Sequence, residues 1–146
     1  MTVAFDLDRF VAAQEPVYAR VRAELAAGAK TSHWMWFVFP QLRGLGRSAT
    51  AEHFGIENRA EAEAYLRHPM LGERLRECTR LVLAVRGRDA TGIFGTPDDM
   101  KLHSSMTLFA EVTDEPLFAE ALERYFGGRR DARTLQLLKE RAAPAS

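Results

Sequence analysis

The sequence has little cysteine, little lysine and no net charge, and each shortage excludes a class of protein. Because Cys78 is the single cysteine, no internal disulfide and no zinc site built from several cysteines can form. Lys and Arg together number 20, as do Asp and Glu, so the positive excess typical of nucleic-acid-binding proteins is missing. Nucleic acid is therefore not an expected partner.

No apolar run approaches the ~18 residues of a membrane span, and the first residues lack the basic start of a signal peptide. We therefore expect a cytoplasmic protein that has no membrane partner. The four histidines, at positions 33, 53, 68 and 103, have no metal-ligand spacing. No metal and no cofactor are expected.

What the chain does contain indicates one folded unit. It has 146 residues, of which 47% are hydrophobic, and this composition is too apolar for a disordered chain. A chain of this size buries about two-thirds of the surface it exposes when unfolded, so it needs no disulfide or metal to fold. Neither a repeat nor a linker divides the chain. We expect a single helical domain over residues 1–146.

The spacing of apolar residues is helical nearly throughout. Val17, Val21 and Leu25 recur at every fourth position and form one apolar stripe. A second stripe follows in residues 71–85, where the apolar side chains again share one face. Strand-like alternation is almost absent. These patterns predict a compact all-α domain of about six to eight helices.

Residues 33–39 break this pattern, because they read His-Trp-Met-Trp-Phe-Val-Phe and hold both tryptophans of the chain. Their β-propensity allows a strand, whereas their period allows a buried, irregular helical turn. We expect a buried element and leave its type open.

The helix expected from residue 97 to residue 112 places two polar side chains on its apolar face. Lys101 and Ser105 fall within the arc of the apolar residues, whereas His103 lies on the opposite side. An inward lysine must pair with a carboxylate, extend to solvent or line a wet pocket. The sequence leaves two interpretations open: an ion pair with Asp98 near the helix start, or a polar site recessed into the apolar face.

Lysine usage indicates a second polar segment. Of the 20 basic residues only Lys30, Lys101 and Lys139 are lysines, so each lysine can mark a place where a compact ammonium is needed. Lys30 precedes His33 and the two tryptophans, and Gln41 follows them. Polar groups beside aromatic rings can hold a planar ligand, although a capped turn leading into the core explains the same residues.

Several of these stretches together resemble a bacterial family. They are residues 30–42, 44–48, 93–102, 104–109, 125–128, 131 and 134–135. The chain is similar over nearly its whole length to the domain-of-unknown-function family numbered 1810, some of whose members carry the label calpastatin. Calpain inhibition resides in disordered repeats, which this ordered composition does not resemble. The resemblance implies a compact, mainly helical domain and no established reaction.

The resulting hypothesis is a small-molecule pocket between residues 30–41 and the helix of residues 97–109. Its ligand would be a small anionic, nucleotide or ADP-ribose-like molecule, and hydrolysis is the reaction an acid–base pair there would support. The expected binding residues are Lys30, His33, Trp34, Trp36, Gln41, Asp98, Lys101 and Ser105. Asp98, Lys101 and His33 are the catalytic candidates.

The alternative is a non-catalytic module for protein interaction, in which the aromatic segment is core or faces a partner. The sequence predicts no oligomeric state.

Overall fold

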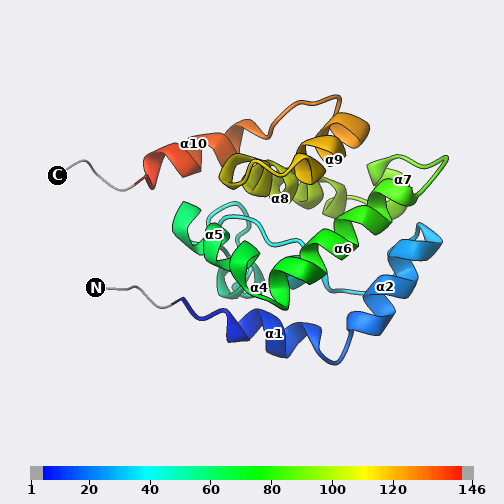
Figure 1. The fold of residues 1–146 in the computed structure, drawn as a ribbon, viewed down its shortest axis with the longest axis horizontal. Helices are drawn as coiled ribbons and strands as arrows, with labels where there is room; N and C mark the ends of the chain where they lie inside the picture. The colour runs from blue at the N-terminus through cyan, green and yellow to red at the C-terminus, as the bar shows by residue number, and fades with distance from the viewer. Residues whose placement is uncertain (1–4, 143–146) are drawn as a thin grey trace.

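The computed structural model describes residues 5–142, which form ten helices (Figure 1). In chain order they are α1 (Asp8–Gln14), α2 (Tyr18–Ala27), α3 (Met35–Val38), α4 (Ala49–His53), α5 (Arg59–Arg67), α6 (Leu71–Ala84), α7 (Ala90–Phe94), α8 (Asp98–Val112), α9 (Pro116–Phe126) and α10 (Ala132–Glu140).

The prediction of an all-α fold is confirmed. Over the described range the chain has no strand, and a single isolated bridge pairs Leu42 with Ile56. The helices outnumber the six to eight expected because α3, α4 and α7 have only four or five residues each. A single turn is too short to repeat an apolar pattern, so periodicity does not reveal it.

The aromatic segment contains one of these short helices. Residues 35–38 form α3, and Trp34, Met35, Val38 and Phe39 are buried. The segment is therefore a buried helical turn, the second of the two types that its sequence left open.

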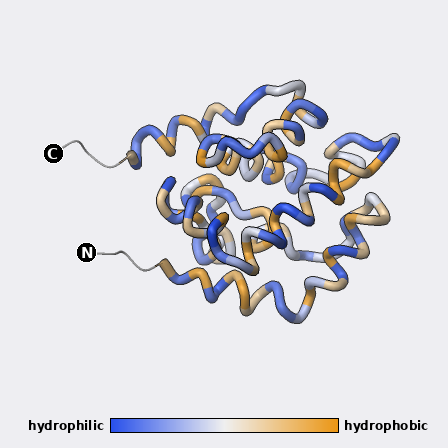
Figure 2. The backbone as a smooth tube through the Cα atoms, in the orientation of Figure 1, coloured by the Kyte–Doolittle hydropathy of each residue, from blue (hydrophilic) through white to orange (hydrophobic). Residues whose placement is uncertain are grey.

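Helix α6 crosses the molecule between two groups of helices (Figure 1). On one side it packs against α2 and α5, and on the other against α9, which in turn packs along α8. Both α7 and α10 also contact α8. Apolar and polar positions alternate in short stretches along the helices (Figure 2), as expected where each helix buries one face.

Aromatic side chains from α1, α5, α8 and α9 meet in the core. The Phe109 ring of α8 lies 5.6 Å from the Tyr65 ring and 5.7 Å from the Phe118 ring, measured between centroids. The Phe10 ring contacts Tyr65 edge-on at 5.1 Å. All four side chains are fully buried. Helix α8 is thus held on its apolar face by the centre of the core.

Helix starts follow the sequence in part. Asn58 and Asp131 accept backbone hydrogen bonds and cap α5 and α10 as side-chain caps do. The expected cap at Thr96 is wrong: Pro97 is the capping position of α8, the Thr96–Pro97 peptide is cis, and the Thr96 hydroxyl faces the Asp99 carboxylate instead.

Among residues 5–142, no helix combines the length and the apolar character that a membrane crossing requires.

We predict that Phe109→Ala lowers the free energy of unfolding by about 3–5 kcal/mol, because it empties a large site in a packed core. Met100→Ala is the control on the same helix, since Met100 is 65% exposed. Chemical denaturation with guanidinium measures both. Equal losses in the two variants would contradict the placement of Phe109 at the centre of the core.

Candidate functional site

Glu24 holds the loop that follows α2. Its carboxylate accepts hydrogen bonds from the Thr31 amide (2.8 Å), the Ser32 amide (3.1 Å) and the Ser32 hydroxyl (2.5 Å). A fourth bond comes from the indole Nε1 of Trp34 at 2.9 Å. One buried carboxylate therefore fixes residues 31–34 and orients the first tryptophan.

These hydrogen bonds change the acidity of Glu24. Burial raises its pKa, but the hydrogen bonds, that of the Ser32 hydroxyl foremost, outweigh burial and lower the pKa to about 2. Glu24 is consequently ionised wherever the protein is folded near neutral pH.

Asp98 brings together the two lysines that the sequence marked. Its Oδ2 atom lies 2.6 Å from Lys30 Nζ, and its Oδ1 atom lies 3.2 Å from Lys101 Nζ. The Lys30 side chain is only 6% exposed, against 18% for Asp98 and 21% for Lys101. The ion pair of Lys101 with Asp98 therefore exists, and Lys30 extends it into a group of three charges.

Both ammonium groups also lie over tryptophan rings. Lys30 Nζ is 5.0 Å from the centroid of Trp34, and Lys101 Nζ is 4.5 Å from that of Trp36. A cation at this distance from an indole face is attracted by the negative face of the ring. Trp34 is fully buried and Trp36 only partly, so Trp36 is the ring that solvent can reach.

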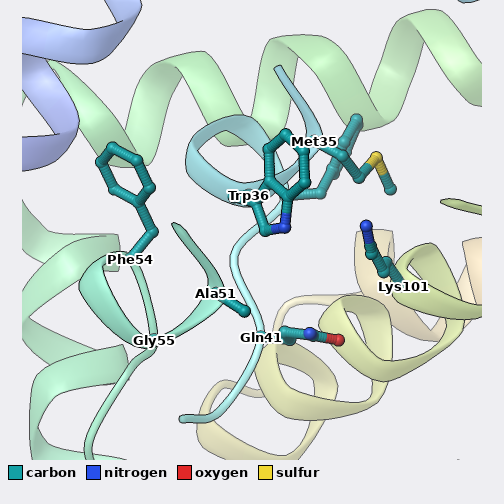
Figure 3. A pocket seen from close by; sticks show the side chains of 8 residues that line it. Met35, Trp36, Gln41, Ala51, Phe54, Gly55 and Lys101 are labelled. Atoms are coloured by element: carbon teal, nitrogen blue, oxygen red, sulfur yellow. The ribbon is translucent and has the colours of Figure 1, made fainter. Parts of the chain in front are cut away.

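A small apolar pocket opens beside Trp36 and Lys101. Its walls are Met35, Trp36, Phe39, Gln41, Ala51, Phe54, Gly55 and Lys101. Figure 3 shows the Lys101 side chain directed toward Trp36 and Met35, with Phe54 on the opposite side. The cavity volume is about 10 Å³, close to what one water molecule needs. It can admit a small group and no more.

A larger groove adjoins this pocket, with a volume of about 290 Å³. It is lined by Gln41, Leu45, Gly46, Pro97, Met100, Lys101, Ser104, Asp131 and Arg133. Gln41 and Lys101 line both spaces. The two side chains therefore stand where the apolar pocket meets the polar groove, and we call the two spaces together the Lys101 site.

The remaining candidates lie outside the Lys101 site. His33 is exposed, and no side-chain hydrogen bond of it occurs within residues 5–142. Ser105 is fully buried, and its Oγ atom has no hydrogen-bond partner among the described residues. Trp34, Lys30 and Asp98 support the site from behind without lining either space.

Sequence reasoning missed the contribution of α10. Arg133 and Asp131 line the groove although they follow Lys101 by about 30 residues in the chain. No spacing rule links them to α8, because only the packing of α10 on α8 brings them there. Met35 and Phe54, which line the small pocket, were also missed, because apolar residues of a core and of a pocket look alike in a sequence.

No three His, Cys, Asp or Glu side chains lie close enough together to hold a metal ion in the described part of the chain.

A family model described as "Protein of unknown function (DUF1810)" matches residues 4–138. The chain belongs to this family. The resemblance found in its sequence motifs is thereby confirmed.

One solved structure is closely similar. It is the crystal structure of the conserved hypothetical protein Rv1873 from Mycobacterium tuberculosis, which is 59% identical in sequence with a TM-score of 0.92. The match covers 92% of this chain and 97% of that one. No curated protein matches the chain. Neither the family description nor the structure's title names a ligand or a reaction, so the function has to be argued from geometry.

We predict that Glu24→Gln lowers the free energy of unfolding by about 2 kcal/mol near neutral pH, because charged acceptors make stronger hydrogen bonds. The pKa of Glu24 is about 2 in the folded state and 4.5 in its ordinary range. The stabilisation is therefore complete above the ordinary value and is lost as the pH falls toward the folded one. Guanidinium titrations at about pH 6 and about pH 3 should show the gap between variant and wild type narrowing in acid. A gap that stays constant would contradict this account.

We also predict that Asp98→Asn lowers the free energy of unfolding by about 3 kcal/mol, because it leaves the buried Lys30 ammonium without its counter-charge. The double variant Asp98→Asn/Lys30→Met should recover part of the loss, since it removes the stranded charge. Asp114→Asn is the control, because Asp114 is exposed. Urea denaturation measures all three, and no recovery in the double variant would argue against a buried ion pair.

Proposed function

We propose that the protein binds a small planar anion of nucleotide type at the Lys101 site. The observation that carries the proposal is that Lys101 and Gln41 both line the apolar pocket and the groove. A cation and an amide at the junction of an apolar and a polar space are the pattern of a ligand site, where a few polar groups orient a mostly apolar contact.

The charges favour an anion. Lys30 and Lys101 carry two positive charges, and Asp98 between them carries one negative charge. One positive charge remains on the three groups, and Lys101 is the lysine that lines the groove. An incoming anion can therefore contact Lys101 while Asp98 keeps its pair with Lys30.

Trp36 and Gln41 favour a planar ligand with polar edges. The Trp36 ring is partly exposed and lines the small pocket, so it offers an aromatic surface. Across residues 5–142, the Gln41 amide makes no side-chain hydrogen bond, although it is half-buried. An amide placed in this way can donate to and accept from the edge of a heterocycle.

The size of the site narrows the ligand class. A groove of about 290 Å³ is at the lower end of the range of ~300–1,000 Å³ for ligand sites. Such a groove suits a mononucleotide better than a molecule as long as ADP-ribose or NAD.

Binding is better supported than hydrolysis. Both oxygens of Asp98 are engaged by ammonium groups, so this carboxylate is not free to take a proton. His33 is exposed and lines neither space, and Ser105 is sealed in the core. The catalytic candidates therefore do not form an acid–base pair around one reacting atom.

The alternative, a module for protein interaction, has less support. The aromatic segment is largely core, because Trp34, Met35 and Phe39 are buried. The exposed large apolar side chains of the described residues are Met100 and Leu135. Two such side chains do not make the extended apolar patch that marks a protein interface.

The test is thermal unfolding in the presence of nucleoside 5′-monophosphates, NAD and ADP-ribose. A ligand at 100 times its Kd adds about 2.7 kcal/mol, which raises the midpoint by several degrees in a domain of this size. We expect a mononucleotide to give the largest shift, and we expect Lys101→Met and Trp36→Ala to remove it.

Lys139→Met is the matched control, because Lys139 is the lysine that is exposed on α10 and lines neither space. It should keep the full shift. A flat response of the wild type to every compound at millimolar concentration would reject the proposal, as would an equal loss of response in the Lys139 variant.

A further inference from the structure

We propose that the α10 side of the groove is a phosphoryl subsite, in which Lys101 and Arg133 bind a phosphomonoester from two walls. This inference rests on the proposed function, because it assigns the anionic end of the same ligand. Lys101 comes from α8 and Arg133 from the first turn of α10, and both line the groove.

The junction of α8 and α10 is held by polar contacts that fix the distance between the walls. The Thr107 hydroxyl accepts a hydrogen bond from the Asp131 amide at 2.9 Å. The Ser104 hydroxyl lies 3.3 Å from Asp131 Oδ2 and donates toward it. Ser104, Thr107 and Asp131 therefore tie the start of α10 to the middle of α8, and they place Arg133 across from Lys101.

Asp131 does not cancel this positive charge. Its Oδ2 atom accepts hydrogen bonds from the Thr134 amide at 3.0 Å and the Thr134 hydroxyl at 2.6 Å, in addition to Ser104. The carboxylate is thus turned toward its own helix, where it caps α10 and interacts with the positive end of the helix dipole.

Arg133 has no structural task that would explain it. Its side chain is exposed, and it forms no ion pair or side-chain hydrogen bond with any residue from 5 to 142. Other arginines of the chain are bound: Arg76 pairs with Glu115 at 2.7 Å, and Arg9 pairs with Glu61 at 3.0 Å. An arginine left open at a groove keeps its planar fork available for an oxoanion.

A phosphomonoester fits this arrangement better than a carboxylate. It carries up to two negative charges near neutral pH and three oxygens, so it can contact an arginine fork and a lysine on opposite walls together. A carboxylate has one charge and two oxygens, which the Arg133 fork alone would satisfy.

The test is isothermal titration of AMP and adenosine into wild type and the Arg133→Gln variant at low salt. We expect wild type to bind AMP about 10- to 100-fold more tightly than adenosine, as charged hydrogen bonds imply. Arg133→Gln should remove most of this difference and leave adenosine binding unchanged. Arg20→Gln is the matched control, because Arg20 is exposed on α2 and lines neither space of the Lys101 site.

Equal affinity of wild type for AMP and adenosine would overturn the phosphoryl subsite, and so would an unchanged AMP affinity in Arg133→Gln. In both cases adenosine binding would leave the proposed function standing. Failure of both compounds to bind would reject the proposed function and the subsite together. A 5′-phosphorylated dinucleotide identifies the source: tighter binding than AMP would support a nucleic-acid end as the carrier of the phosphate, and weaker binding a free metabolite.

Discussion

The site depends on one carboxylate shared by two ammonium groups. Asp98 begins α8, and its two oxygens reach Lys30 in the loop after α2 and Lys101 one turn further along α8. Burying the Lys30 ammonium would be costly without this partner. Because Lys30 takes one oxygen from behind, Lys101 is left at the edge of the groove with a charge that Asp98 only partly offsets. The same contact therefore joins two segments of the fold and prepares the surface between them.

Glu24 supports this arrangement from a second position. It fixes the loop that carries Lys30 by accepting backbone hydrogen bonds from Thr31 and Ser32, and it fixes Trp34 through the indole nitrogen. The Lys30 ammonium then lies over the oriented Trp34 ring. Two carboxylates thus hold a short loop rigidly, so that a ligand in the groove would meet side chains that are already in place.

Much of the fold and part of the site could be predicted from the sequence. The helical class followed from apolar spacing, and the place of Lys101 on an apolar face followed from its register with Leu102 and Phe109. Lys30 was found only through its scarcity, because its partner Asp98 lies 68 residues further along the chain. Arg133 could not be found, since its place at the groove depends on how α10 packs against α8 and no local pattern encodes such packing.

The distribution of the three lysines has a practical consequence for labelling. Amine-reactive reagents modify accessible, unpaired ammonium groups most rapidly. Lys30 and Lys101 are both ion-paired and largely covered, whereas Lys139 is exposed on α10. Brief treatment with a fluorescent ester or a coupling resin would therefore attach preferentially at Lys139 and the amino terminus. The protein could be tagged or immobilised for binding measurements with its groove left chemically untouched.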